Sequence, residues 1–321
     1  MSSLVFIDDS FIEKNSDFNQ LIECLNSDFA TATIHVPQRH HHDYANPSAG
    51  TDSTLLLMPA FNPGHEAGVK MITINPDNAK QQLPSIQGIY VLMDANTGNI
   101  KAVLDAKSLT AKRTAATSAL ASKFLAREES SSLLMIGTGL LAGNLIRAHA
   151  MVRPLRQVFV WGRSMDKAQA VCDALAEESY RCTAIATLEP FISKVDIISC
   201  ATLSPTPLVL GENLVPGQHV DLVGSYQPTT READDSVIRR SSVFLDTYQG
   251  GLTESGDIRI PLDTGVISAS DIKADLYELC GGTKQGRSFQ NEITCFKSVG
   301  HALEDLSAAT YFYNLYNTTN V

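Results

Sequence analysis

The middle of the chain alternates short apolar runs with segments in which apolar residues recur at helical spacing. Residues 133–136 form one such run, and apolar positions then recur every three or four residues until Pro154. This alternation is typical of βαβ units with a parallel sheet. Asp166 is the predicted N-cap of the next helix. Further apolar runs predict strands at 158–161, 182–185, 195–200, 220–223 and 243–246.

The first third of the chain shows a different pattern, in which apolar segments are separated by turns. These segments predict antiparallel strands at 55–58, 69–74, 88–93 and 100–104, with a hairpin turn at 94–99 (DANTGN). Helices are predicted from about Ser108 to Arg127 and from Asn291 to Tyr316. We therefore expect an α/β protein in which a parallel-sheet domain, residues 116–297, is inserted into an α+β domain built from residues 1–115 and 298–321.

Composition and charge restrict the class of protein and its partners. The chain has 321 residues, of which 44% are hydrophobic and 19% charged, so it can form a globular core. A formal net charge of −10 disfavours binding to the phosphates of nucleic acids. No apolar run approaches the roughly 18 residues of a membrane span, and Asp8 and Asp9 stand where a signal peptide would carry cations. We therefore expect a cytoplasmic protein without a nucleic acid or membrane partner.

The cysteines and histidines do not indicate a metal site. The six cysteines form no CxxC pair and are interpreted as reduced, mostly buried thiols. The run His40–His42 would place successive side chains on alternate faces of an extended chain, which does not suit a tetrahedral site. We expect no metal.

A glycine motif follows the first strand of the predicted parallel sheet. Gly137-x-Gly139-x-x-Ala142 lies between that strand and a helix, as in dinucleotide-binding folds. Gly137 permits a tight turn, and Gly139 lets a pyrophosphate approach the N–H groups at the helix N-terminus. The motif favours nucleotide binding over an ordinary glycine-rich turn, and it places Thr138, Leu140 and Leu141 at the cofactor.

The end of the second predicted strand bears on the choice of coenzyme. An acidic residue there would bind the ribose hydroxyls of NAD and repel a 2′-phosphate. Residues 157–165 contain no acid, whereas Arg163 and Ser164 offer a guanidinium and a hydroxyl that suit a phosphate. We therefore expect NADPH to be preferred. The alternative is that Arg163 is a solvated loop residue and that NADH is accepted as well.

Three basic residues stand out in the outer domain: Arg39, Lys70 and Arg113. Lys70 lies between apolar Val69 and Met71 in a predicted strand, and a strand lysine facing a cleft would have a lowered pKa. Taken singly, each of the three would ordinarily be a surface cation.

Several segments together resemble the ornithine cyclodeaminase and mu-crystallin family, and the resemblance covers nearly the whole chain. The resemblance implies a Rossmann domain combined with a dimerisation and substrate domain, and a homodimer. The segments that carry it are 57–60 (LMPA), 68–70 (GVK), 109–116 (LTAKRTAA), 136–142 (IGTGLLA), 223–232 (VGSYQPTTRE) and 292–300 (EITCFKSVG).

The resemblance also implies roles for individual residues. Arg39, Lys70 and Arg113 are expected to converge on the carboxylate of an amino or imino acid, with Lys70 also the candidate catalytic residue. Ser298 and Gly300 are expected near the nicotinamide, and Thr114 among the cofactor-binding residues.

One position departs from the cyclodeaminases of this family. They carry an aspartate for hydrolytic release of ammonia where this chain has Tyr226, in the sequence GSYQP. The pattern looks more like the bacterial imine reductases of the family, which act on Δ1-pyrroline-2-carboxylate and Δ1-piperideine-2-carboxylate. We therefore expect an NADPH-dependent reductase of small cyclic 2-imino acids. Ornithine cyclodeaminase or alanine dehydrogenase activity, or coenzyme binding without turnover, are the alternatives.

Overall fold

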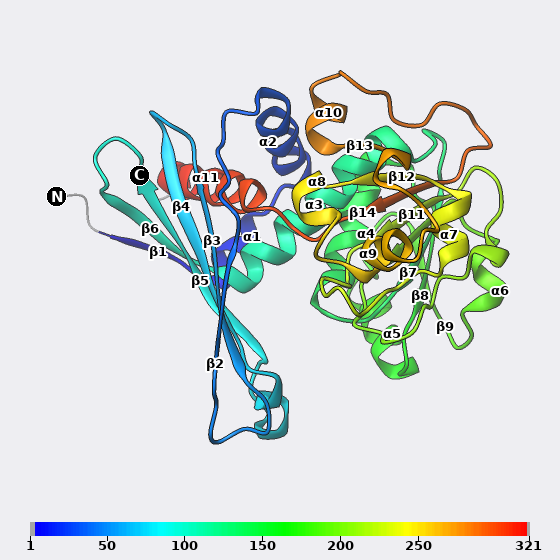
Figure 1. The fold of residues 1–321 in the computed structure, drawn as a ribbon, viewed down its shortest axis with the longest axis horizontal. Coiled ribbons are helices and arrows are strands. Elements are labelled where there is room, and N and C mark those ends of the chain that lie inside the picture. Colours follow the sequence, from blue (N-terminus) through cyan, green and yellow to red (C-terminus); the bar gives the residue numbers. More distant parts are fainter. Residues whose placement is uncertain (1–3, 320–321) are drawn as a thin grey trace. The chain divides into compact units, whose positions relative to one another are not determined.

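The computed structural model describes residues 4–319 and divides the chain into two compact units. One unit is formed by residues 1–113 together with 301–321, and the other by residues 114–300. We call them the six-stranded unit and the eight-stranded unit, after their sheets (Figure 1). The division falls inside one long helix, α3 (Ala106–Leu125).

The six-stranded unit is a largely antiparallel sheet of order β1-β6-β5-β4-β3-β2, in which β1 alone pairs in parallel, with β6. The four predicted strands are confirmed as β3 to β6, and the predicted turn joins β5 to β6, where the Asp94 N–H donates to the Asn99 carbonyl. The strands are β1 (Val5–Ile7), β2 (His40–Tyr44), β3 (Ser53–Phe61), β4 (Glu66–Ile74), β5 (Ile86–Asp94) and β6 (Ile100–Asp105).

Helices cover one face of this sheet. The C-terminal helix α11 (Ala302–Thr319) contacts β3, β4 and β5 and also packs on α2 (Phe18–Thr31), and a short helix α1 (Asp9–Asn15) precedes α2. Because side chains alternate along a strand, every second row of the sheet points to these helices. One buried row runs across the sheet through the paired residues Ile7, Leu104, Tyr90, Lys70 and Met58.

The eight-stranded unit is a fully parallel sheet of order β13-β12-β14-β11-β10-β7-β8-β9. From β7 the chain proceeds outward through β8 and β9 and then returns to start β10 on the other side of β7. In such sheets ligands bind at the carboxyl ends of the strands where the order reverses. The strands are β7 (Ser132–Ile136), β8 (Gln157–Trp161), β9 (Arg181–Ile185), β10 (Ile197–Cys200), β11 (His219–Leu222), β12 (Ser242–Leu245), β13 (Ile272–Asp275) and β14 (Thr294–Lys297).

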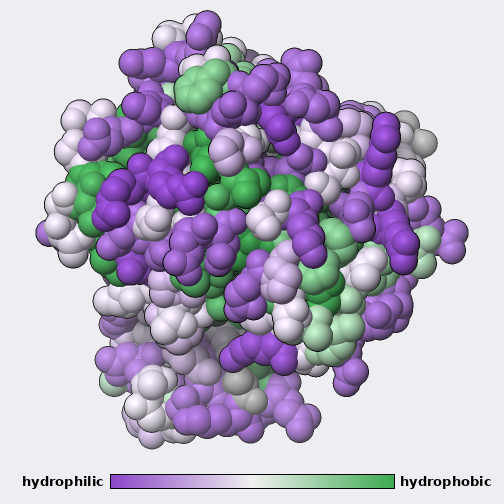
Figure 2. All heavy atoms as spheres, turned by 90° about the vertical axis from the view of Figure 1, so that its right-hand side faces the viewer, coloured by the Kyte–Doolittle hydropathy of each residue, from purple (hydrophilic) through white to green (hydrophobic). Residues whose placement is uncertain are grey.

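Helices lie on both sides of this sheet (Figure 1). The interior strands are buried; β7 is largely apolar, whereas β11 and β14 also bury polar and charged residues such as Asp221 and Lys297. Polar and charged side chains cover most of the face seen in Figure 2, with smaller hydrophobic areas between them. The helices are α4 (Leu140–Val152), α5 (Met165–Asp173), α6 (Glu189–Ile192), α7 (Asp235–Arg240), α8 (Tyr248–Gly251), α9 (Gly256–Asp263) and α10 (Leu276–Cys280).

Two sequence-based predictions are wrong in this unit. The predicted helix at 291–316 begins only at Ala302, because residues 294–297 form β14 between β11 and β12, where the sheet buries them completely. The N-cap of α5 is Ser164 rather than Asp166, since the Ser164 hydroxyl accepts the Lys167 N–H and Asp166 lies in the first turn.

Candidate active site

A cluster of opposite charges is buried in the six-stranded unit. Lys70 lies on β4 between its cross-strand neighbours Met58 and Tyr90, and only 1% of its surface is exposed. Its Nζ lies 2.8 Å from Asp305, which is fully buried on α11. Arg113, near the middle of α3, donates from Nε to the same Asp305 carboxylate over 2.9 Å. One carboxylate therefore pairs with two of the three predicted substrate-binding cations.

Burial and neighbouring charges shift the pKa values in this cluster. The pKa of Lys70 is lowered to about 8, first by burial and then by the charges of Arg113 and, to a smaller extent, Arg39, while Asp305 opposes them. Burial by itself would raise the pKa of Asp305, but Arg113 and Lys70 outweigh it and hold that pKa below its usual value. A lysine with this pKa can gain or lose a proton near neutral pH.

Three further side chains extend the cluster. Glu304, fully buried, binds the Arg113 guanidinium at Nη1 over 2.5 Å. Burial and then Arg39 lower the pKa of His301 to about 4, so that its imidazole is neutral at pH 7. Arg39 precedes β2 and is partly exposed, and its charge contributes to lowering the pKa values of Lys70 and His301. The structure thus brings Lys70 and Arg113 together on Asp305, with Arg39 in the same unit.

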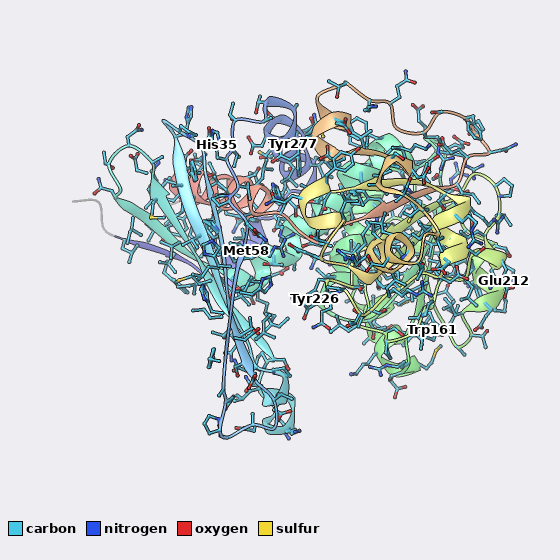
Figure 3. All side chains as sticks on the ribbon, viewed as in Figure 1. His35, Met58, Trp161, Glu212, Tyr226 and Tyr277 are labelled. Atoms are coloured by element: carbon cyan, nitrogen blue, oxygen red, sulfur yellow. The ribbon has the colours of Figure 1, made fainter. Side chains whose placement is uncertain are left out.

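The glycine motif of the eight-stranded unit borders a cavity of about 360 Å³. Of the predicted cofactor-binding residues, Gly137, Thr138, Gly139 and Arg163 line it. The segment 201–205 lines it as well, and Trp161, at the end of β8, also contributes (Figure 3). Arg163 is the single charged residue in this lining as far as the described chain extends, so that the cavity favours an anion.

The geometry of the two glycines fits a dinucleotide. Gly137 has a φ of +121°, and a Cβ there would lie 2.5 Å from the Ala201 carbonyl oxygen. Gly139 is the N-cap of α4, and a Cβ there would meet no atom within 4 Å, so that the space in front of the helix N-terminus is open. An open helix N-terminus of this kind binds phosphate groups. The residues present therefore suit the pyrophosphate of NAD(P).

The other predicted cofactor-binding residues lie outside this lining. Leu140 and Leu141 form the first turn of α4. Ser164 caps α5, directly after Arg163. The remaining three are Thr114, which is buried on α3, and Ser298 and Gly300, which follow β14.

A buried carboxylate holds the segment that follows β14. Ser298 Oγ donates to Asp246 over 3.2 Å, and the Val299 and Gly300 N–H groups donate to the same carboxylate over 2.7 and 2.8 Å. Gly300 has a φ of +82°, which favours glycine at that position.

Tyr226 lies half-buried on the loop after β11 (Figure 3). Burial raises its pKa above the usual value of 10, so its hydroxyl stays protonated near neutral pH. It therefore lacks the basicity that a carboxylate at this position would have.

Sequence reasoning missed Glu304 and Asp305. Both belong to the helical pattern near the C-terminus, where acidic residues are ordinarily solvated. A signal was present, because these two acids lie within the apolar stretch 302–309 (ALEDLSAA), which is buried throughout. Charged residues inside a buried helical segment need partners, and here the partners come from strands and helices distant in sequence.

Other parts of the described chain add little to this picture. A larger cavity, about 660 Å³, lies in the six-stranded unit between α2 and α11, and none of the predicted site residues line it. Within residues 4–319, no group of histidine, cysteine and carboxylate side chains is arranged to hold a metal ion. The described helices include none that is both long and apolar enough to cross a membrane.

Comparisons with known proteins agree with this geometry. Residues 5–320 match the model of the ornithine cyclodeaminase/mu-crystallin family. The Arabidopsis thaliana Protein SAR DEFICIENT 4 is 40% identical over 89% of each chain. A Delta(1)-pyrroline-2-carboxylate reductase of Colwellia psychrerythraea is 35% identical over 93% of this chain and 95% of the relative.

A solved structure is similar over the full length. The Thermococcus litoralis Delta(1)-pyrroline-2-carboxylate reductase, in complex with NADH and L-proline, has a TM-score of 0.92 to this structure, with 30% identity and 99% of both chains covered. The mixed architecture expected from the sequence, with a Rossmann-type domain and a separate sheet domain, is confirmed. The chain thus belongs to the ornithine cyclodeaminase/mu-crystallin family.

Proposed function

We propose that this protein is an NAD(P)H-dependent reductase of small cyclic 2-imino acids, converting Δ1-pyrroline-2-carboxylate to L-proline and Δ1-piperideine-2-carboxylate to L-pipecolate. The observation that carries the proposal is the buried pair of cations, Lys70 and Arg113, that share the Asp305 carboxylate. The similarity to reductases named for the first of these imines supports it.

The charges of the buried cluster favour an anionic substrate. Lys70 and Arg113 are buried cations on one carboxylate, and the charge of Arg39 acts on Lys70 as well. A substrate carboxylate would be attracted by these positive charges. Burial strengthens that attraction, because the effective dielectric constant is lower than in water.

Lys70 supplies the proton in this proposal. Reduction of an imine adds a hydride to carbon and a proton to nitrogen; bound NAD(P)H supplies the hydride. The Lys70 ammonium, with its pKa near 8, is protonated in most molecules at pH 7 and gives up its proton more readily than an ordinary lysine. Asp305 holds Nζ in place and stabilises the charged form before the transfer.

Tyr226 distinguishes this reaction from cyclodeamination. Imine reduction requires no activated water, whereas hydrolytic loss of ammonia requires a general base. The raised pKa of Tyr226 makes it unsuited to act as that base near neutral pH, which favours the reductase over the cyclodeaminase.

We propose NADPH as the preferred coenzyme. Arg163 borders the cavity of the glycine motif, and the described lining carries no carboxylate that would repel a 2′-phosphate. A guanidinium pairs well with phosphate through two parallel hydrogen bonds.

We further propose that the free face of the six-stranded sheet makes a homodimer. The row next to the buried one contains Phe6, Val103, Val91, Val69 and Pro59, which pair across five strands. Phe6 is 62% exposed, and Ile89, which lies on the same face of β5 as Val91, is 36% exposed. A broad apolar face of this kind is typical of a protein interface.

The experiment that tests the function is the initial rate of NADPH oxidation with each of the two imines, repeated with NADH. We expect oxidation with both imines, faster with NADPH. Two control reactions, ammonia release from L-ornithine and pyruvate reduction in the presence of ammonia, should give no turnover. Ammonia from ornithine without imine reduction would overturn the proposal, and coenzyme binding without any turnover would identify a binding protein.

A further inference from the structure

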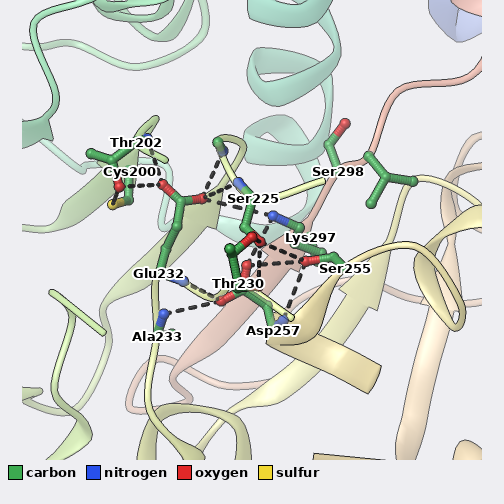
Figure 4. Close-up of polar contacts among 12 residues, drawn as sticks. Cys200, Thr202, Ser225, Thr230, Glu232, Ala233, Ser255, Asp257, Lys297 and Ser298 are labelled. Carbon is green, nitrogen blue, oxygen red and sulfur yellow. Dashed lines mark hydrogen bonds and ion pairs between the residues drawn. The ribbon is translucent and has the colours of Figure 1, made fainter. Parts of the chain in front are cut away.

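Glu232, itself fully buried, lies at the centre of a polar network in the eight-stranded unit (Figure 4). Its carboxylate accepts the N–H groups of Thr202 over 2.7 Å, Gly224 over 2.6 Å and Ser225 over 3.2 Å. These donors follow β10 and β11 at their carboxyl ends. One side chain therefore holds together the segments that leave two neighbouring strands.

The segment that follows β10, residues 201–205, is also a wall of the cavity at the glycine motif. Its residues line that cavity together with Gly137 and Gly139. The segment is confined between two glycines: a Cβ on Gly137 would lie 2.5 Å from the Ala201 carbonyl oxygen, and one on Gly224 only 2.1 Å from the Thr202 nitrogen. Its position therefore depends on close packing on both sides and on the bond from Thr202 to Glu232.

Glu232 is itself fixed by a second carboxylate and a lysine. Asp257 accepts the N–H groups of Glu232 and Ala233 over 2.7 and 3.0 Å. Lys297, also buried completely, lies 3.0 Å from Asp257 and 3.7 Å from Glu232 (Figure 4). A buried network with several partners of this kind gives one defined arrangement rather than several.

We infer that Glu232 is a positioning residue for the dinucleotide: through the Thr202 N–H it fixes the wall formed by residues 201–205. This inference rests on the proposed function, because it assumes that the cavity binds NAD(P)H. It assigns Glu232 no contact with the reacting atoms. A Glu232→Gln variant would keep the size of the side chain but turn an NH₂ group toward backbone N–H donors.

Trp161 provides the measurement. It is the one tryptophan of the chain and lines the cavity, so its fluorescence should be quenched when NADPH binds. In E232Q we expect the dissociation constant of NADPH to rise about tenfold, because a buried hydrogen bond is replaced by an unsatisfied donor. Amide hydrogen exchange at Thr202 and Gly224 in the free protein should become faster.

Asp196 offers a matched control. Its carboxylate accepts the N–H groups of Ser131 and Ser132 over 2.9 and 3.1 Å, at the amino end of β7 and so away from the edge that carries the glycine motif. D196N should lower the thermal stability but leave NADPH binding unchanged. If E232Q does not fold, E232D replaces it, since aspartate keeps the charge opposite Lys297 but is one methylene shorter.

The outcomes separate this inference from the proposed function. Weaker binding in E232Q or E232D, with unchanged binding in D196N, supports it. Unchanged binding and unchanged exchange at Thr202 in a folded Glu232 variant overturn it while leaving the reductase proposal intact. If D196N weakens NADPH binding as much as the Glu232 variants do, the effect is a general loss of stability, and the inference is overturned. Failure of the wild-type protein to bind either coenzyme would overturn the proposed function first.

Discussion

Lys70 Nζ lies 2.8 Å from each carboxylate oxygen of Asp305, although the two residues are 235 positions apart in the chain. The carboxylate also binds Arg113, so a single acid on α11 stabilises two buried cations from β4 and α3. The ion pair with Asp305 holds the Lys70 ammonium in place, and it also opposes the loss of the ammonium proton.

The alkaline limb of the pH–rate profile should report Lys70. With its pKa near 8, loss of the ammonium should make kcat/KM for the imine fall above about pH 8, by about tenfold per pH unit. K70M should lose about 100-fold in activity and should no longer show this limb. An unchanged limb in K70M would exclude Lys70 as its source.

The free energy of unfolding should rise with pH over the range in which the activity falls. The pKa of Lys70 is lowered from 10.5 to about 8 in the folded state, so the unfolded chain binds more protons between these two values. The contribution of Lys70 to the free energy of unfolding should therefore rise with pH across that window and be constant below it. Denaturant unfolding at pH 7 and pH 10, compared between wild type and K70M, measures this difference.

Replacing Asp305 by asparagine should move the alkaline limb to lower pH. Asp305 raises the pKa of Lys70, so its loss should leave burial and Arg113 to lower that pKa further. E304Q is the matched control, because Glu304 binds Arg113, whereas Asp305 binds Lys70 directly. If the alkaline limb moves equally in D305N and E304Q, the specific effect of Asp305 on Lys70 is contradicted. D305N should also lower stability by about 3–5 kcal/mol, since Lys70 loses its carboxylate partner while Arg113 keeps Glu304.

Gly139→Ala should abolish coenzyme binding without harming the fold. A Cβ at Gly139 meets no protein atom within 4 Å, so the thermal unfolding temperature should not fall. The added methyl group would, however, occupy the open space at the N-terminus of α4, where we place the pyrophosphate. G143A, one turn into the same helix, should bind NADPH normally, as its Cβ would meet only Arg147 at 3.7 Å. Normal binding by G139A would mean that the phosphates bind elsewhere.

Arg163→Ala should affect the two coenzymes differently. If Arg163 pairs with the 2′-phosphate, KM for NADPH should rise about tenfold or more, while KM for NADH stays within about twofold of the wild-type value. Steady-state kinetics with each coenzyme at saturating imine measures this. Equal changes for both coenzymes would indicate that Arg163 does not read the phosphate.

Ile89→Lys should separate the proposed dimer. Ile89 lies on β5, on the same face as Val91, and is 36% exposed. A charge in an apolar interface is costly, so light scattering should show the monomer mass for I89K and the dimer mass for wild type. M151K, which places a lysine at an exposed methionine of α4, is the control and should remain dimeric. A monomeric wild-type protein would refute the dimer itself.

Much of the architecture could be predicted from the sequence because local patterns specify it. The alternation around 133–200 predicted a parallel sheet, and Gly137 predicted a tight turn before α4, which the structure contains. Strand β14 escaped prediction because its four residues, 294–297 (TCFK), show no pattern that separates them from a helical segment until the neighbours β11 and β12 are known.

The site was only partly predictable. The sequence by itself singled out Arg39, Lys70 and Arg113, and the family resemblance implied a shared role for them. Neither indicated that Asp305 would join two of these cations or that Glu232 would bind backbone groups of two separate segments. Hydrophobic periodicity specifies which face of an element is buried, since it depends on near neighbours in the chain. Ion pairs and buried hydrogen bonds join residues that are distant in sequence, and only the packing of helices on sheets decides which of them meet.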